Sequence, residues 1–200
     1  MFRTVIKTSV ASGWREARRE NARAAVLAAA WDLVREDGLA ALSLRELARR
    51  AGITTPTVYA YYESKNAIFD AMFAEAAQEF VDLKASLPAT DDARRDLLTE
   101  TRAFVDFCVS DVPRYQLLFQ RSVPGFQPSP ESYELAVSAL EVTRELLARN
   151  GVHDPRYLDI WTAVTTGLVD QQVANDPGGD RWSRLVDDVV QMFLAQFSKN

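Results

Sequence analysis

The residues best suited to carry chemistry lie in one stretch of the chain, Ser43 to Lys65, which reads SLRELARRAGITTPTVYAYYESK. Between Thr54 and Tyr61 this stretch offers threonine hydroxyls, tyrosine phenols and methyl groups, and it contains no carboxylate. A surface that is rich in hydrogen-bond donors and free of negative charge suits the phosphate-lined grooves of DNA. The composition of this stretch therefore favours nucleic-acid recognition.

Two short helices around a tight turn are predicted to position these side chains. Ser43 and Glu46 have the S-x-x-E spacing of a capping box, so a helix is predicted to begin at Ser43. Gly52 supplies the left-handed conformation that ends a helix. Thr54 is expected to cap the next helix, and Pro56 is tolerated in its first turn. This order is that of the helix-turn-helix motif, whose second helix enters the major groove. An ordinary helical hairpin with the tyrosines as core packing is the alternative.

The distribution of charge supports docking on DNA by one end of the chain. The 200 residues carry a net charge of -5 and are 48% apolar, enough to bury a sizeable core. Residues 1–65 hold eleven Lys and Arg against seven Asp and Glu, whereas residues 66–200 hold twelve against twenty-one. A basic N-terminal part on an acidic body fits a protein that binds a polyanion with only one end.

Other classes of function find little support in the residues. The single histidine, His153, and the single cysteine, Cys108, lie far apart, and no metal-ligand cluster, nucleotide loop or catalytic triad is visible. The carboxylates are predicted to lie on solvated faces or helix caps, so we expect no enzyme and no cofactor. Cys108 is predicted to be a buried filler in a reducing, cytoplasmic compartment. No apolar run of about 18 residues or secretory signal is found, so no membrane association is expected.

Helical periodicity continues through the rest of the chain and predicts nine helices and no strand. An irregular segment, SVPGFQPSP, interrupts the pattern at residues 122–130. The last two helices, at about 155–175 and 181–197, are apolar around more than half of their circumference. A helix that packs on a monomer needs only one apolar stripe, so the surplus predicts a subunit interface. The helices outside the Ser43–Lys65 stretch are predicted at 14–37, 64–87, 92–110, about 111–119, 131–150, about 155–175 and 181–197.

From Ala24 to about Phe73 the chain resembles the N-terminal domain of the TetR (tetracycline repressor) family of transcriptional regulators. The matching features are, in order, a long helix ending at Asp37-Gly38, then Ser43–Ala48, Ala51–Ile53, Thr57–Tyr59, Tyr62, Ser64-Lys65 and Ile68-Phe69. The resemblance implies an all-α, two-domain, nine-helix fold. It predicts a flexible N-terminal arm at 1–13, a three-helix helix-turn-helix domain at 14–63, and a helical ligand-binding and dimerisation domain at 64–200.

The resemblance also assigns roles at matched positions. Arg45 lies where the family often places a base-contacting arginine, and a guanidinium can pair with both O6 and N7 of guanine. Phosphate contacts are implied for Tyr59, Tyr61 and Lys65, and Ser43 can donate to a phosphate as well as cap its helix. The predicted DNA-binding residues are Ser43, Arg45, Thr54, Thr55, Pro56, Thr57, Tyr59, Tyr61 and Lys65.

For the C-terminal body the resemblance implies a pocket for a small molecule and a four-helix dimer interface. We expect a hydrophobic or aromatic effector, with pocket walls that include Phe104, Tyr115, Tyr133, Trp161 and Thr165. The expected function is that of a repressor that binds a palindromic double-stranded operator as a homodimer and is released when the effector shifts the helix at 64–87. An activator, a regulator without a ligand, and a helical protein that has lost DNA binding are the alternatives.

Overall fold

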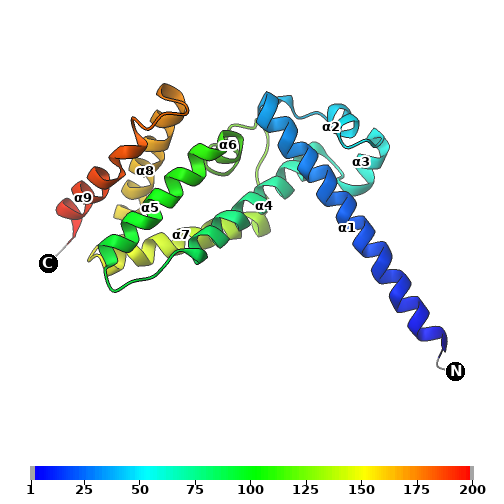
Figure 1. The fold of residues 1–200 in the computed structure, drawn as a ribbon, viewed down its shortest axis with the longest axis horizontal. Coiled ribbons are helices and arrows are strands. Elements are labelled where there is room, and N and C mark those ends of the chain that lie inside the picture. The colour runs from blue at the N-terminus through cyan, green and yellow to red at the C-terminus, as the bar shows by residue number, and fades with distance from the viewer. Residues whose placement is uncertain (1–2, 199–200) are drawn as a thin grey trace. The chain divides into compact units, whose positions relative to one another are not determined.

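The computed structural model describes the backbone of residues 3–198 and the side chains of residues 17–198. All regular secondary structure in this part of the chain is helical and none of its residues forms a strand, which confirms the predicted all-α class (Figure 1). Its elements are α1 (Arg3–Asp37), η1 (Leu39–Ala41), α2 (Leu44–Arg50), α3 (Thr55–Tyr61), α4 (Lys65–Ser86), α5 (Ala93–Ser110), α6 (Val112–Phe119), α7 (Pro130–Arg149), α8 (Pro155–Asn175), η2 (Ser183–Leu185) and α9 (Val186–Phe197).

The chain divides into two compact units. The first reaches to Met72 and includes Val123–Gln127, and the second comprises Phe73–Ser122 and the chain from Pro128 onward. The division falls within α4, whereas the predicted boundary between residues 63 and 64 falls at its start. Helical backbone is already present at Arg3, ahead of the predicted start at residue 14. The contacts expected of an arm at residues 1–13 lie outside the described side chains.

The first unit is built on α1, against which α2 and α3 pack (Figure 1). One face of α1 is buried through Val26, Ala30 and Val34, and Leu47 of α2 and Val58 of α3 are fully buried beside it. Full burial of a valine or leucine side chain contributes about 1.5–3 kcal/mol. This small core holds the two short helices, which are too short to be stable alone.

The segment Val123–Gln127 belongs to this first unit, although it connects α6 to α7. Its Phe126 ring lies 5.6 Å from the ring of Phe69, centroid to centroid. The Asn66 amide donates to the carbonyl of Gly125 at 3.4 Å. These contacts cover Phe126, the one large apolar side chain in the proline-rich stretch, and attach the segment to the first turns of α4.

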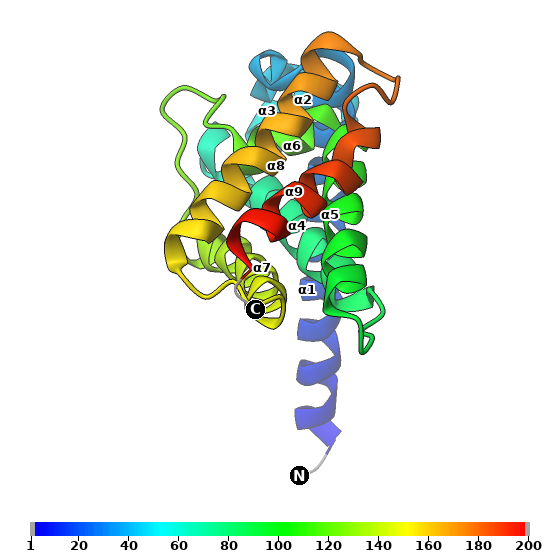
Figure 2. The same cartoon turned by 90° about the vertical axis from the view of Figure 1, so that its left-hand side faces the viewer.

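The second unit is organised around α5, which packs against α6, α7, α8 and α9 (Figure 2). Side-chain caps start most of these helices, because Asp92, Asp111, Ser129 and Asp154 each accept from a backbone N–H of the following turn. Cys108 is fully buried in the core of this unit, as predicted, and burial raises the pKa of its thiol. In the described part of the chain, no helix combines the length and apolar character needed to cross a membrane.

The last helix begins later than predicted. Residues 181–185 form turns and a 3-10 segment, and α9 starts at Val186 and not at residue 181. Gln172 of α8 holds this segment, because its side-chain carbonyl accepts from the backbone N–H groups of Trp182 and Ser183 at 2.8 and 3.1 Å. These two bonds attach the turn before α9 to α8.

Candidate DNA-reading head and ligand cavity

The two short helices of the first unit are capped by the side chains that the sequence indicated. Ser43 Oγ accepts from the Glu46 N–H at 3.2 Å, and Thr54 Oγ1 accepts from the Thr57 N–H at 3.4 Å. Gly52 between them has φ of 66°, a conformation that costs glycine little. Only half of the predicted capping box forms, because the Glu46 carboxylate turns to arginines and not back to Ser43.

As predicted, the outer face of α3 carries no carboxylate. Val58 and Tyr62 point into the core, and the Tyr62 hydroxyl donates to the carbonyl of Arg23 at 3.3 Å. The hydroxyls of Thr54 and Thr57 lie 2.8 Å apart, so one of them donates to the other. Exposed or half-buried side chains are found at every predicted DNA contact, namely Ser43, Arg45, Thr54, Thr55, Pro56, Thr57, Tyr59, Tyr61 and Lys65.

The three arginines of α2 differ in their partners. Glu46 accepts from Arg49 at 2.6 and 2.9 Å and from Arg50 at 3.2 Å. These hydrogen bonds, from Arg49 first and then Arg50, lower the pKa of Glu46 to about 2. Arg50 also reaches Glu36 at 2.7 Å. Arg45 is exposed and has no ion-pair partner among the described side chains, so its guanidinium is available to a ligand.

Lys65 begins α4 beside this face. Its Nζ lies 5.4 Å from the centroid of the Phe69 ring, and Ser64 caps the helix by accepting from the Ala67 N–H at 3.1 Å. A cation at a helix N-terminus opposes the helix dipole, and a phosphate bound there would relieve that repulsion. The geometry is compatible with the predicted phosphate contact.

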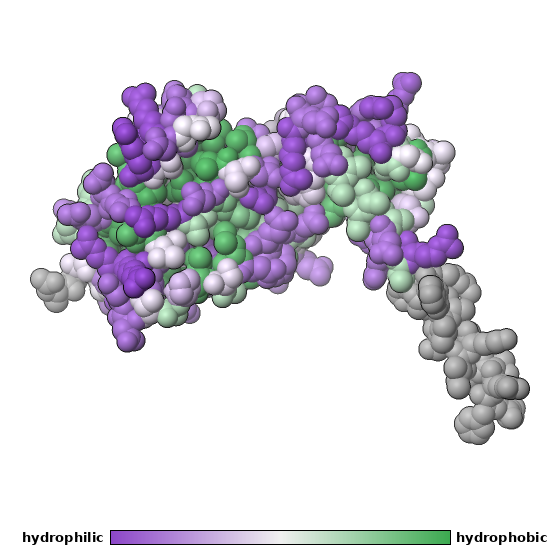
Figure 3. All heavy atoms as spheres, in the orientation of Figure 1, coloured by the Kyte–Doolittle hydropathy of each residue, from purple (hydrophilic) through white to green (hydrophobic). Residues whose placement is uncertain are grey.

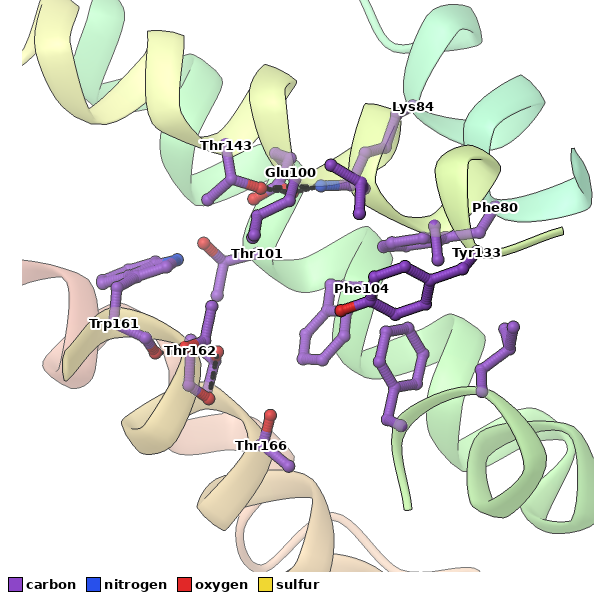
Figure 4. A pocket seen from close by; sticks show the side chains of 16 residues that line it. Phe80, Lys84, Glu100, Thr101, Phe104, Tyr133, Thr143, Trp161, Thr162 and Thr166 are labelled. Carbon is purple, nitrogen blue, oxygen red and sulfur yellow. Dashed lines mark hydrogen bonds and ion pairs between the residues drawn. The ribbon is translucent and has the colours of Figure 1, made fainter. Parts of the chain in front are cut away.

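The second unit contains a cavity of about 280 Å³ between α4, α5, α6, α7 and α8 (Figure 4). Four of the five side chains predicted to line a pocket do line it, namely Phe104, Tyr133, Trp161 and Thr165. One end is aromatic: the Phe104 and Phe119 ring centroids lie 5.5 Å apart, and the Phe80 and Phe104 centroids 5.9 Å apart. The rest of the wall carries threonines and a buried ion pair.

Tyr115, the fifth of these side chains, is not among the residues that line this cavity. Its side chain is fully buried, and its hydroxyl donates to the Asp170 carboxylate at 2.5 Å. Burial and this carboxylate raise the pKa of the Tyr115 hydroxyl. Gln120 donates to the same carboxylate oxygen at 2.6 Å. Because Asp170 lies on α8 and Tyr115 on α6, the aromatic ring is held by a bond between helices.

The buried ion pair was missed by the sequence analysis. Lys84 Nζ lies 2.5 Å from Glu100 Oε1, and both side chains are only 4% exposed. Lys84 also donates to the Ala139 carbonyl at 2.8 Å and to Thr143 Oγ1 at 2.7 Å. Thr143 in turn donates to Glu100 at 2.9 Å. Figure 4 shows this network at the α4, α5 and α7 side of the cavity.

A second buried carboxylate also corrects the expectation that acids lie only on solvated faces or caps. Asp96 is almost completely buried and accepts from the Thr90 hydroxyl at 2.6 Å and the Thr90 N–H at 3.0 Å. Arg149 pairs with it at 2.8 Å. The Thr90 hydrogen bonds, followed by Arg149, hold the pKa of Asp96 below its ordinary value.

The first unit is similar in sequence to a known family of proteins. The family model described as "Bacterial regulatory proteins, tetR family" matches residues 26–72. The transcriptional activator FasR of Mycolicibacterium smegmatis is 30% identical over 103 residues, which is 51% of this chain and 47% of that protein. The class D tetracycline repressor of Escherichia coli is 36% identical over 76 residues, 38% of this chain and 34% of the repressor.

The chain spans about half the length, or less, of these curated relatives. The likeness in fold extends further. A tetR-family transcriptional regulator from Streptomyces coelicolor superposes with a TM-score of 0.70 at 21% identity, covering 88% of this chain and 80% of that one. The nine α-helices of the described residues therefore share the fold of a solved TetR-family structure.

Proposed function

We propose that the chain, which belongs to the non-enzymatic TetR family of DNA-binding transcriptional regulators, is a cytoplasmic repressor. It binds a palindromic operator as a homodimer. A hydrophobic or aromatic small molecule releases it from the operator. The observation that carries the DNA part is the sorting of arginines on α2. Glu46 pairs with Arg49 and Arg50, and Arg45 is left exposed without an ion-pair partner among the described side chains.

A homodimer is supported by apolar side chains that the second unit leaves uncovered. Ile160 of α8 and Met192 of α9 are 40% and 60% exposed. Figure 3 shows apolar areas among hydrophilic side chains on the visible face of this unit. A two-fold dimer would present two identical heads to half-sites about 34–36 Å apart. Met192→Asp is expected to weaken the dimer in sedimentation velocity, and dimers at unchanged affinity would contradict the interface.

Binding to the DNA upstream of its own gene tests the reading head. Arg45→Ala is expected to cost about 1–3 kcal/mol at the specific site and much less on unrelated DNA. Lys65→Ala is expected to weaken both and to lower the salt dependence by about one charge. Arg49→Ala is the matched control, because Arg49 lies on the same helix as Arg45 but is already paired with Glu46. Equal losses of specificity for Arg45→Ala and Lys65→Ala would contradict the assigned roles.

Control by a ligand is supported by the cavity, whose wall includes α4, the helix that begins in the first unit and ends in the second. A ligand shifts an equilibrium only by its differential affinity for two states. If a ligand binds in the cavity and operator affinity stays unchanged in a titration, this part of the proposal is contradicted. The alternative, an activator or a regulator without a ligand, is decided by a promoter–reporter assay, since the named relatives include both an activator and a repressor.

A further inference from the structure

The only cation in the wall of the described cavity is already fully engaged. Lys84 has three N–H donors, and the structure gives it three acceptors, the Ala139 carbonyl, Thr143 Oγ1 and Glu100 Oε1, all within 2.8 Å. A ligand anion cannot accept a hydrogen bond from Lys84 unless one of these three bonds breaks. The same anion would meet the Glu100 carboxylate, which also lines the cavity.

Four of the five threonines in the described wall are also committed as donors. Thr101 donates to the Leu97 carbonyl at 2.7 Å, Thr162 to the Asp159 carbonyl at 2.9 Å, and Thr165 to the Trp161 carbonyl at 2.9 Å. A hydroxyl has one proton and two lone pairs, so each of these groups retains only the ability to accept. Together with Glu100, they make the polar part of the wall rich in acceptors.

Three donors in the wall remain without an acceptor among the described residues, and all are uncharged. They are the Tyr133 hydroxyl, the Thr166 hydroxyl and the Trp161 indole N–H. Figure 4 shows the Tyr133 hydroxyl directed into the cavity. None of these groups can neutralise a charge, and a buried charge without a partner is strongly unfavourable.

The opposite part of the cavity is a cluster of phenylalanine rings. Phe80, Phe104 and Phe119 lie 5.5–5.9 Å from one another, centroid to centroid, at angles between tilted and edge-on. Such rings accept a further aromatic ring by stacking or edge contact. The cavity volume, about 280 Å³, lies just below the usual range for ligand pockets, about 300–1,000 Å³, and favours a small ligand.

We propose that the ligand of this cavity is an uncharged aromatic molecule that carries a hydrogen-bond donor, such as a phenol or an aryl alcohol, and that the closed Lys84–Glu100 pair makes the cavity reject carboxylates. The ring occupies the phenylalanine cluster, and the donor binds the Glu100 carboxylate or a threonine lone pair. This inference rests on the proposed ligand-responsive function and names the chemical class of the ligand for the same site.

Isothermal titration of the full chain with four naphthalenes of matched shape tests the ligand class. The neutral donor 2-naphthalenemethanol is expected to bind at least about tenfold more tightly than 2-naphthoate or 2-naphthylmethylammonium. 2-Methoxynaphthalene, which accepts but does not donate, is expected to bind about five- to tenfold more weakly than the alcohol. Binding of the carboxylate or the ammonium as tight as that of the alcohol overturns the proposal, and so does binding of none of the four.

Charge variants test whether the ion pair sets the preference. Glu100→Gln leaves the Lys84 cation unpaired and is expected to move the preference toward 2-naphthoate by at least about tenfold. Lys84→Met leaves the Glu100 anion unpaired and is expected to move it toward the ammonium. The double variant Lys84→Met/Glu100→Leu carries no charge at this site and is expected to prefer the alcohol. It also keeps the test usable if a single variant fails to fold. A double variant that binds 2-naphthoate best overturns the role of the pair.

Measuring operator binding in the same samples distinguishes failure of the ligand class from failure of the ligand-responsive function. If the alcohol binds as expected but never changes operator affinity, the ligand class stands and the ligand-responsive function fails. If operator affinity responds to a carboxylate more strongly than to the alcohol, the function stands and the ligand class fails.

Discussion

Removing Lys84 while leaving Glu100 in place should be among the most destabilising single changes in the second unit. Lys84→Met keeps most of the stem volume but removes the donors to Glu100, Thr143 and the Ala139 carbonyl. The Glu100 carboxylate then has only the Thr143 hydroxyl as a donor among the described residues. A buried charge that loses its partner is the cause of the expected loss.

The magnitude follows from burial. Both side chains are only 4% exposed, and breaking such a pair costs about 3–5 kcal/mol. Because Glu100 borders the cavity, water can reach it in part, and we expect the low end of the range, about 3 kcal/mol. For a chain of this length each kcal/mol lowers the melting temperature by about 2–4 °C, so the shift should be about 6–12 °C.

Urea denaturation followed by circular dichroism measures this loss, and two variants calibrate it. Arg102→Met breaks an ion pair of similar length, 2.6 Å to Asp187, whose side chains are 54% and 55% exposed. Exposed pairs contribute about 0–1 kcal/mol, so this control should change little. Lys84→Met/Glu100→Leu removes both charges and should fall within about 1 kcal/mol of the parent or be more stable.

Two results would refute the reasoning. If Lys84→Met costs no more than Arg102→Met, burial does not govern the strength of the pair. If the double variant is as unstable as Lys84→Met, the loss comes from the missing side chains and not from the uncompensated charge of Glu100.

Four further predictions concern single groups. Tyr115→Phe removes the bond to Asp170 and should cost about 1.5–3 kcal/mol in urea denaturation; no change would contradict the role of the bond. Cys108 should not react with iodoacetamide until the protein unfolds, because burial raises its pKa; labelling of the folded protein at the rate of a free thiol would contradict this. The pKa of Asp96 is lower in the folded protein than its ordinary value of 3.8, so the ionised carboxylate stabilises the fold above that pH and this stability is lost as the pH falls. Asp96→Asn should therefore flatten the dependence of the unfolding free energy on pH between about pH 5 and 2. Glu46→Gln frees the two arginines that it pairs and should raise affinity for unrelated DNA with a steeper salt dependence; an unchanged slope would contradict it.

The parts of the fold that depend on local chemistry could be predicted from the sequence. Ser43, Gly52 and Thr54 determine where α2 and α3 begin and end through bonds to residues three positions away or through one backbone angle. These signals need no knowledge of the tertiary structure. The turn before α9 could not be found in this way, because it is held by Gln172, which lies ten residues from the backbone N–H that it binds.

The cavity shows the same limit. Helical spacing identified Phe104 and Trp161 as inward-facing, but it does not say which inward-facing residues of different helices meet. Lys84 stands one turn after Phe80 on an apolar stripe of α4, and Glu100 stands one turn before Phe104 on α5. A charge inside an apolar stripe was the available signal, and opposite signs on two helices would have indicated the pair.

One rule explains the difference between the two sites. In the reading head Glu46 engages two of the three arginines of α2, and the remaining one, Arg45, is left exposed to a ligand. In the cavity Glu100 engages the only lysine of the described wall, and no cation remains. In each site one glutamate decides whether a cation stays unpaired. Glu46 leaves Arg45 unpaired where DNA would bind, and Glu100 leaves no unpaired cation where the small molecule would bind. A ligand that carried a negative charge would be attracted to the head and not to the cavity, so an uncharged effector avoids competing with the operator for the same surface.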